Sequence, residues 1–441
     1  MVTICIIVMF FSVFLNWYRK KSWISLLTIF VAIWTMILCF SKLQWYDMVS
    51  VSQKIYNIVC IGCMMFVVGY TISSYLKIRF VFSKNKSNYL RHPKYEINSK
   101  VLLVILIIVF VFESFIGIRV AGVLLSGGSF NLIHDMAGGY AETALLNSAF
   151  ESYMDVLVIM PCVFSVIPIS LIMLFDKRIK YKWLLFSLFA ADLFLYILVH
   201  GGRVAILYIV VDIILLYYLY GHKMKRKTKR KIIIAVLAAI TVVVFLTLIR
   251  KGVSAGDKSA GEAVGSSIYK YFSASMPLMD YWVDVIDEQQ FQSYGMAFLH
   301  GVLNFFDIFL SKIGISFDLL NQTSFYIGQT ESTFLYGLYD HGSFNAFVSV
   351  FYFFYMDFRW VGVIVGSLFF GFFCHRVERL ANKNNLLNSA LYLLIAQSVL
   401  KSFGRWEFYL TSYCLSFLFL RICFKRKMIS DKTEGGENYG T

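Results

Sequence analysis

Apolar runs of about 20 residues recur along almost the whole chain, and that length suits a membrane-spanning helix. In lipid a helix satisfies all of its own backbone hydrogen bonds, whereas an open strand or loop leaves some of them unmade. The chain is 59% hydrophobic and 15% charged, whereas an average soluble domain carries about 25% charged residues. The sequence therefore predicts an all-α polytopic membrane protein.

The apolar runs predict about 11 transmembrane helices. The first eight lie within residues 1–249, the last three lie within residues 358–423, and residues 424–441 form a cytoplasmic tail. The predicted spans are 1–18, 22–43, 55–76, 101–125, 152–175, 181–199, 203–220, 232–249, 358–374, 386–400 and 407–423.

Basic residues stand in short clusters between the apolar runs, such as residues 19–21, 223–231 and 425–427. A nucleic-acid binder gathers its basic residues on one face or stripe, so the net charge of +15 does not indicate nucleic acid as a partner. Lysine and arginine accumulate in cytoplasmic loops of membrane proteins. Placing the basic clusters inside the cell puts the amino terminus outside and the carboxyl terminus inside.

One long stretch, residues 250–357, is too polar for lipid and too apolar for a free linker. We therefore predict that it folds as a large extracytoplasmic loop domain, which we call the cap. Within the cap, residues 343–356 are apolar but short for a span, and they are predicted to form a re-entrant or interfacial helix. Residues 296–315 are a candidate amphipathic helix that lies on the bilayer.

Three arginines are predicted to surround one outer vestibule. Arg203 follows Gly202 at the start of a predicted span, where glycine lets the backbone approach a ligand closely and an arginine can grip a phosphate. Arg250 leaves the eighth span, and Arg405 lies in a short outer turn. Jointly they indicate a phosphate or pyrophosphate site. The alternatives are a tight turn at Gly202, interfacial anchoring at Arg250, and an ion pair between Arg405 and Glu407.

The cap also holds candidate general bases, since histidine and carboxylate side chains accept protons near neutral pH. The candidates are His300, Asp280 and His341, and the sequence does not choose among them. The alternative for each is an ordinary solvated loop residue. The acidic residues form no Asp-x-Asp pair or histidine-rich cluster, so neither a metal nor another cofactor is expected.

Charged residues also occur within predicted spans, where burial in lipid is costly. Glu113 and Arg119 share the fourth span, but a separation of six residues is poor helical spacing for a mutual pair. We therefore expect each of them to pair with another helix.

A series of short motifs follows the cap. The segment contains Asn345-x-Phe347, an aromatic run at 351–355, Asp357-Phe358-Arg359 and then Gly362. This order resembles the Asn-x-Phe, aromatic run, Asp-Phe-Gly and x-x-Gly pattern of the Wzy-type oligosaccharide repeat-unit polymerases, which make O-antigen and capsular polysaccharide. Arg359 stands where that pattern usually has glycine. The likeness covers residues 190–375 and includes Gly202-Arg203 and Arg250.

The resemblance implies a glycosyltransferase of the bacterial cytoplasmic membrane. Such polymerases transfer a glycan chain from undecaprenyl pyrophosphate to the non-reducing end of an incoming lipid-linked repeat unit. By similarity, arginines bind the pyrophosphates and a base in or near the cap activates the acceptor hydroxyl, without a metal. Asn345 and Tyr271 are expected among the substrate contacts. A flippase and a chain-length regulator are expected partners, beside the lipid-linked glycans and the membrane lipid.

Two alternatives remain open at the level of sequence. An O-antigen-ligase-like enzyme would move a finished glycan to another acceptor and needs the same vestibule. A lipid-linked oligosaccharide flippase or other transporter would carry paired broken helices and midplane charges, usually in two related halves. The polar residues gather instead in one outer cap, which favours an enzyme.

Overall fold

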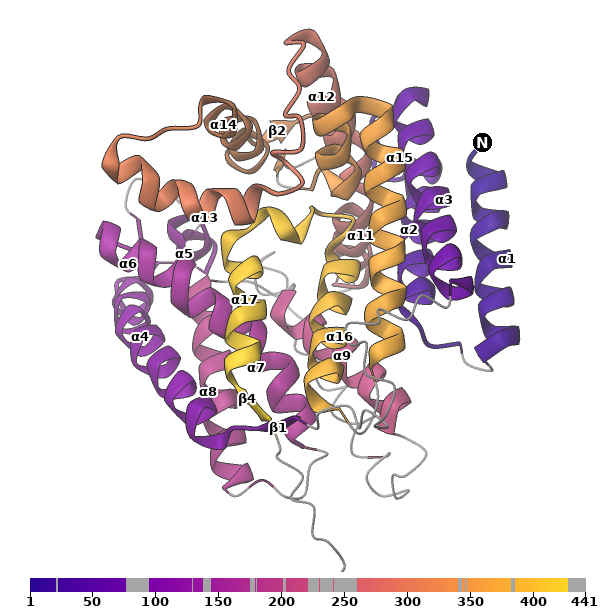
Figure 1. The fold of residues 1–441 in the computed structure, drawn as a ribbon. Coiled ribbons are helices and arrows are strands. Elements are labelled where there is room, and N and C mark those ends of the chain that lie inside the picture. Colours follow the sequence, from indigo (N-terminus) through magenta and orange to yellow (C-terminus); the bar gives the residue numbers. More distant parts are fainter. Residues whose placement is uncertain are drawn as a thin grey trace, which may run out of the picture.

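The computed structural model describes residues 1–20, 23–76, 95–128, 130–137, 144–174, 179, 181–200, 204–220, 230, 241, 260–339, 343–345, 347–381 and 385–426. Long helices dominate this part of the chain and run roughly side by side as a bundle (Figure 1). They are α1 (Val2–Lys20), α2 (Leu26–Leu43), α3 (Gln53–Tyr75), α4 (Ser99–Leu125), α6 (Ala149–Met154) continued by the π-helix η1 (Asp155–Ile159) and α7 (Met160–Met173), α8 (Lys182–His200), α9 (Val204–Tyr220), α15 (Ser349–Leu380), α16 (Leu386–Lys401) and α17 (Thr411–Ile422).

Seven helical segments among the described residues are long and apolar enough to cross a membrane, and three shorter apolar helices accompany them. The shorter helices cover Ala205–Tyr220, Leu386–Lys401 and Thr411–Ile422. The predicted all-α membrane fold is therefore confirmed. The predicted span at 232–249 lies outside the described residues, and the total of 11 spans stays a prediction.

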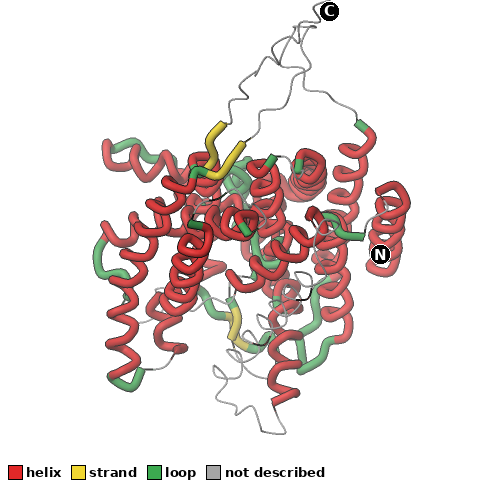
Figure 2. The backbone as a smooth tube through the Cα atoms, turned by 90° about the horizontal axis from the view of Figure 1, so that it is seen from below, coloured by secondary structure: helices red, strands yellow, loops and turns green. Residues whose placement is uncertain are grey.

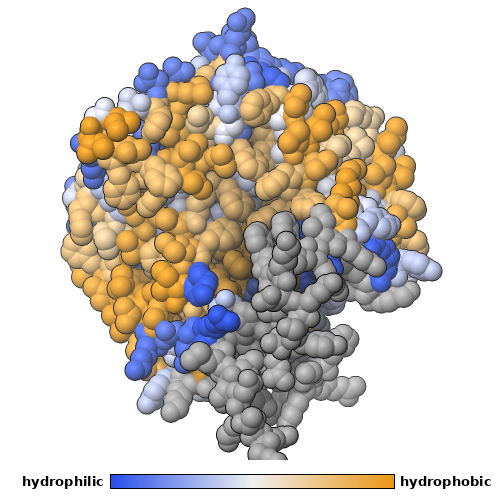
Figure 3. Space-filling view, in the orientation of Figure 1, coloured by the Kyte–Doolittle hydropathy of each residue, from blue (hydrophilic) through white to orange (hydrophobic). Residues whose placement is uncertain are grey.

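The outer surface of the bundle is apolar. A broad hydrophobic band covers the face seen in Figure 3, and hydrophilic residues gather above it. Large side chains such as Phe10 and Phe11 of α1, and Val111 and Ile118 of α4, point outward and are more than half exposed. A soluble monomer rarely exposes so much contiguous apolar surface, which here suits contact with lipid tails.

Shorter elements lie together at one end of the bundle, which is also the end where α1 begins (Figure 1). The cap sequence supplies most of them, and α13 runs across the axes of the long helices. Its Val302, Phe306 and Phe309 are each about half exposed. The elements are α5 (Phe130–Ala137), α11 (Ala260–Ser273), α12 (Ser275–Glu288), α13 (His300–Leu310), η3 (Ser311–Ile313), α14 (Asp318–Ser332) and the antiparallel pair β2 (Leu335–Tyr336) and β3 (Ser343–Phe344).

A second strand pair lies at the opposite end of the bundle. Strand β1 (Tyr95–Ile97) leads into α4 and pairs antiparallel with β4 (Phe424–Arg426), which follows α17. Figure 2, viewed from that end, shows the two strands next to each other. The pair brings the basic residues Lys425 and Arg426 beside the start of α4. This is the end that the distribution of basic residues predicts to face the cytoplasm.

Helix α15 is a hairpin of two helical limbs. Phe358 and Arg359 interrupt it with non-helical backbone angles. A Cβ atom added at Gly362 would lie only 2.0 Å from the carbonyl oxygen of Phe354. In a continuous helix two residues eight positions apart are separated by about 12 Å along the axis. The limb before Phe358 and the limb after Arg359 therefore lie against each other. The segment 343–356, expected as one re-entrant or interfacial helix, contains β3 and this first limb.

Both limbs of α15 pack closely on α3. Phe351 of the first limb covers Gly62, and the backbone of Leu368 in the second limb meets Gly69. A Cβ atom at Gly69 would lie 2.0 Å from the carbonyl oxygen of Leu368, so the two backbones touch only because no side chain intervenes. Since Gly62 lies near the middle of α3, the first limb starts well inside the bundle.

Arg359 occupies the turn of this hairpin with φ 52° and ψ −132°, a conformation that glycine adopts far more readily. The related polymerase pattern usually has glycine here, and the backbone angles explain that preference. Arg359 offsets its strain with contacts: Nη1 lies 2.8 Å from Asp287 Oδ1, and Nη2 donates to the carbonyl oxygens of Ile286 and Phe291.

This balance between strain and contacts predicts different outcomes for two substitutions. Arg359→Ala loses the contacts and keeps the strained backbone, so we expect it to destabilise the fold by about 1–3 kcal/mol. Arg359→Gly loses the same contacts but relaxes the backbone, so its melting temperature in detergent should fall between those of wild type and Arg359→Ala. Equal melting temperatures for the two variants would contradict the strain argument.

Candidate functional site

The loop 402–410, between α16 and α17, is recessed within the bundle rather than placed at its outer rim. The N–H groups of Val348 and Ser349 donate to the carbonyl oxygen of Gly404 at 3.0 and 3.1 Å. Trp34, halfway along α2, donates from Nε1 to Ser402 Oγ at 3.1 Å. The cap elements α13 and α14 lie above this loop in Figure 1. Polar groups of the loop therefore sit beneath the cap and beside the start of the α15 hairpin.

Arg405 is the centre of a charged cluster in this loop. Its Nε donates to Glu407 Oε1, and its Nη1 donates to Glu331 Oε1 and to the Tyr409 hydroxyl, each at 3.2 Å. Tyr409 also donates to Glu331. The Glu407 side chain is fully buried, while that of Arg405 is 25% exposed. Within the part of the chain that the structure describes, Arg405 Nη2 forms no hydrogen bond. Two carboxylates hold the arginine, and its Nη2 is left for a ligand as far as the described residues show.

Lys401, the last residue of α16, adds a second positive charge. It interacts electrostatically with Arg405, Glu407 and Glu331, and its Nζ lies 5.7 Å from the centre of the Phe347 ring. The cluster thus combines two cations with two carboxylates. A dianionic group such as a phosphate could bind the cations in exchange for part of their present pairing.

Two predicted substrate contacts, Asn345 and Tyr271, lie beside this cluster. Asn345 Nδ2 donates to the backbone carbonyl oxygen of Glu331 and so fixes the end of α14 that supplies the Glu331 carboxylate. The Tyr271 ring of α11 packs on Phe347 and Phe403, with ring centres 5.0 and 5.6 Å apart. The structure therefore brings together Arg405, Asn345 and Tyr271 from three distant parts of the sequence.

His300 begins α13 and reaches the same loop. Its Nδ1 lies 2.9 Å from the carbonyl oxygen of Tyr409, and its Nε2 lies 2.8 Å from Ser324 Oγ. A carbonyl oxygen only accepts, so Nδ1 carries the proton and Nε2 is the basic nitrogen of the neutral ring. Burial lowers the pKa of His300, although the Tyr409 carbonyl and the nearby Glu331 oppose that shift. The ring is therefore protonated less readily than a free imidazole.

The lowered pKa predicts a pH-dependent stability. The unfolded chain takes up the His300 proton at its ordinary pKa of about 6.5, before the folded chain does. The stabilisation is therefore complete above that pH and is lost as the pH falls toward the lower folded-state pKa. We expect the melting temperature in detergent to fall less between pH 7.5 and 5.0 for His300→Asn, whose side-chain amide can still donate to Tyr409. An unchanged pH dependence in this variant would contradict the assignment.

Asp280, the carboxylate candidate for a general base, lies away from this cluster. It accepts hydrogen bonds from the Ser52 backbone N–H at 2.6 Å and from Ser52 Oγ at 2.5 Å, at the start of α3. A carboxylate at that position neutralises the free N–H groups of a helix N-terminus. Asp280 thus attaches α12 to α3. The remaining predicted site residues, Gly202, Arg203, Arg250 and His341, lie outside the described residues.

Asp357 organises the site but was not selected as a site residue from the sequence. It is almost fully buried and accepts four hydrogen bonds, from Ser293 Oγ at 2.6 Å and from the N–H groups of Gly295, Ala297 and Phe298 at 2.8–3.0 Å. The carbonyl oxygen of Phe298 in turn accepts from Trp406 Nε1 at 2.9 Å. The aspartate of the motif therefore fixes the loop 293–298, which contacts the loop that carries Arg405. Its place in the motif was the signal that sequence reasoning could have used.

The intramembrane charges of α4 face other helices, and Arg119 forms an ion pair there. Arg119 of α4 binds Glu151 of α6 through two parallel hydrogen bonds of 2.7 and 2.8 Å. This agrees with the prediction that Arg119 pairs with another helix and not with Glu113. Glu113 of the same helix lies near Asp155 of η1 and His200 of α8. Among the described residues, this is the one group of acidic and histidine side chains with the spacing of metal ligands.

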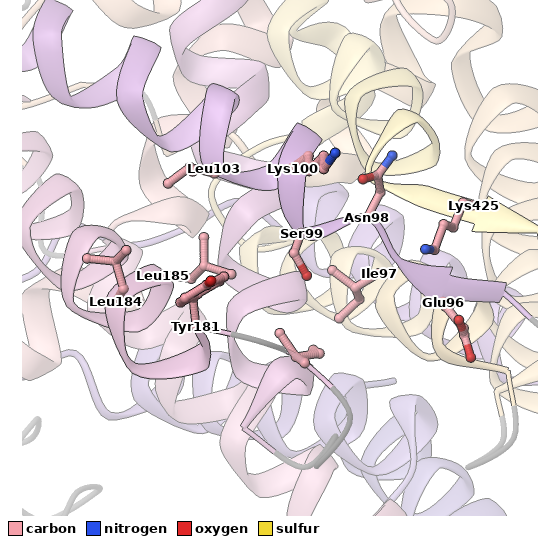
Figure 4. Close-up of a pocket in the computed structure, with 11 residues that line it drawn as sticks. Glu96, Ile97, Asn98, Ser99, Lys100, Leu103, Tyr181, Leu184, Leu185 and Lys425 are labelled. Atoms are coloured by element: carbon pink, nitrogen blue, oxygen red, sulfur yellow. The ribbon is translucent and has the colours of Figure 1, made fainter.

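A cavity of about 480 Å³ lies at the opposite end of the bundle, where α4 and α8 begin (Figure 4). Lys100 and Lys425 line it together with Glu96, Asn98 and Tyr181. None of the predicted site residues lines this cavity. The site is therefore better defined by the charged cluster around Arg405 than by the size of this cavity.

The fold and the Arg405 cluster define the chain as a polytopic helical membrane protein with a recessed site of paired charges beneath a cap. A family model described as O-antigen polysaccharide polymerase Wzy matches residues 136–432, which is more than half of the chain. The chain therefore belongs to the Wzy O-antigen polymerase family, as its motifs predict. No curated protein and no solved structure matches it.

Proposed function

We propose that this protein joins undecaprenyl-pyrophosphate-linked oligosaccharide repeat units into O-antigen or capsular polysaccharide. The reaction takes place at the outer face of the bacterial cytoplasmic membrane, with the amino terminus outside and the carboxyl terminus inside. Membership of the polymerase family supports the reaction class. The basic clusters between the spans support the orientation, since lysine and arginine accumulate on the cytoplasmic side.

In the proposed reaction, the bond between the first sugar of the growing glycan and its pyrophosphate breaks. A hydroxyl at the non-reducing end of the incoming repeat unit forms the new glycosidic bond, its proton passes to a base, and undecaprenyl pyrophosphate leaves. Negative charge develops on the leaving pyrophosphate, and fixed cations that meet it there lower the barrier. We assign this task to Arg405 and Lys401, joined by Arg203 and Arg250, so that no metal is needed at the phosphates.

The position of Arg405 is the observation that carries this proposal. Glu407 and Glu331 hold its Nε and Nη1, which aims the guanidinium before any substrate binds. A preorganised charge of this kind stabilises the transition state more than a mobile lysine or arginine in water does, since no reorganisation is needed during the reaction. The neighbouring aromatic rings of Tyr271 and Phe347, which pack on the buried Phe403, offer flat apolar surface for sugar rings.

The base is proposed from the cap. Burial lowers the pKa of His300, whose Nδ1 contacts the carbonyl oxygen of Tyr409 and whose Nε2 contacts the hydroxyl of Ser324. His341 remains a candidate. Asp280 already accepts two hydrogen bonds from Ser52, which makes it the weakest of the three.

Length-resolved glycan analysis of a deletion strain tests the proposed function. We expect one repeat unit per carrier in place of a ladder, and a plasmid copy of the protein should restore the ladder. A normal ladder that stays on the lipid carrier would instead indicate the ligase reaction. Absence of lipid-linked repeat units from the outer face would indicate a transporter.

A further inference from the structure

Glu113, Asp155 and His200 come from three different helices and converge inside the bundle. Their ligand atoms all lie within 4.8 Å of one another. His200 Nε2 is 3.4 Å from Glu113 Oε1 and 3.8 Å from Asp155 Oδ1. Glu113 is fully buried and Asp155 is 3% exposed. The three residues are far apart in the sequence, so no short motif reveals them.

These carboxylates are poorly satisfied by the protein itself. Among the described residues, neither oxygen of Glu113 has a hydrogen-bond partner, and Asp155 Oδ1 has none. The distances to His200 exceed the 2.7–3.2 Å or so of a normal N–H···O bond. Arg119, the nearby arginine of α4, is engaged by Glu151. Burying a carboxylate without a donor or a counterion costs several kcal/mol, so the cluster needs a positive charge, which either a protonated His200 or a bound cation supplies.

Two of the three spacings are close to those in the ligand shell of a small transition-metal ion. Zinc binds histidine nitrogen and carboxylate oxygen at about 2.0–2.2 Å in tetrahedral sites. Two ligands of a tetrahedron are then separated by about 3.3–3.6 Å, from that bond length and the tetrahedral angle. The 3.4 and 3.8 Å distances from His200 are close to this value. One imidazole with two carboxylates suits zinc or manganese, whereas magnesium and calcium prefer oxygen ligands alone.

We propose that Glu113, Asp155 and His200 bind one divalent transition-metal ion of the zinc class. The ion would cross-link α4, η1 and α8 within the bundle. Asp155 opens the π-helical turn η1, and such turns inside α-helices often mark functional sites. The proposal does not rest on the polymerase reaction, in which arginines contact the phosphates.

Zinc binding by the purified protein tests the proposal. The protein is prepared in detergent without a histidine tag, stripped with a chelator, and titrated with Zn²⁺ alone in a chelator-buffered calorimetric assay. We expect one ion per chain in wild type and at least a tenfold loss of affinity in Glu113→Gln and in His200→Gln. Asp192→Asn is the matched control, because Asp192 is also buried on α8 and accepts no hydrogen bond from the described residues, but it is not one of the three ligands. It should keep wild-type affinity.

Thermal unfolding separates a lost site from a misfolded variant. Zn²⁺ should raise the melting temperature of wild type and Asp192→Asn, and should leave that of Glu113→Gln unchanged even where this variant folds normally without metal. Failure of the wild type to bind one Zn²⁺ per chain would overturn the proposal. Equal affinity in wild type, Glu113→Gln and His200→Gln would overturn it as well, because the ion would then bind elsewhere.

Discussion

Arg405→Ala should reduce polymer formation by about 100-fold or more while lipid-linked single repeat units still accumulate. The variant removes the guanidinium that we place at the pyrophosphate, and it leaves Glu407 buried beside Glu331 without their shared counterion. Extension of a lipid-linked repeat unit by the purified protein, resolved by length, measures the effect. Arg19→Ala is a control of the same kind, since Arg19 contacts Ser74 at an exposed position far from the cluster. It should give a normal ladder.

Arg405→Lys tests whether the directional hydrogen bonds of the guanidinium group are needed, or only its positive charge. Arg405 reaches Glu407 through Nε and Glu331 through Nη1, and a lysine ammonium cannot reproduce this fork while also meeting a phosphate. We therefore expect Arg405→Lys to be almost as inactive as Arg405→Ala. Full activity of the lysine variant would reduce the role of Arg405 to charge alone. Wild-type chain lengths in Arg405→Ala, at a normal protein level, would refute the site assignment.

The membrane fold was predictable because apolar run length is a local property. Each predicted span among the described residues overlaps an observed apolar helix, since a helix is the way for such a run to satisfy its backbone in lipid. The hairpin in α15 was harder to foresee. The stretch 343–374 is mainly apolar and its only charged residues are Asp357 and Arg359, and the reversal depends on a positive φ that arginine seldom adopts.

The candidate site was predictable only in part, because most of its contacts join distant residues. The pair of Arg405 with Glu407 could be inferred from a separation of two residues, whereas Glu331 belongs to another helix of the cap. Asp280 appeared as a free carboxylate in the sequence, but it binds Ser52 in a helix more than 200 residues earlier. Residue type predicted which side chains can bind a phosphate or accept a proton. Their actual partners are set by tertiary packing.

Asp357→Ala should destabilise the fold by about 4 kcal/mol, one of the largest effects expected from a single substitution in this chain. The change removes the acceptor of four hydrogen bonds and leaves three N–H groups of the loop 293–298 without this partner in a largely buried region. In Asp357→Asn one oxygen still accepts hydrogen bonds, but an NH₂ group replaces the second oxygen. That NH₂ group then faces a hydrogen-bond donor instead of accepting from it. Its melting temperature in detergent should therefore fall between those of wild type and alanine.

The same substitution should also impair polymerisation by displacing Arg405, because the loop held by Asp357 accepts the hydrogen bond of Trp406, next to Arg405. Asp284→Ala is the matched control. Asp284 is 59% exposed and binds only Lys54 among the described contacts, so its loss should cost less than about 1 kcal/mol. An Asp357→Asn protein that folds normally and keeps wild-type chain length would show that the motif aspartate stabilises the hairpin without positioning the site. A fall in turnover larger than the fraction of unfolded protein would instead establish the link from Asp357 through the loop 293–298 to Arg405.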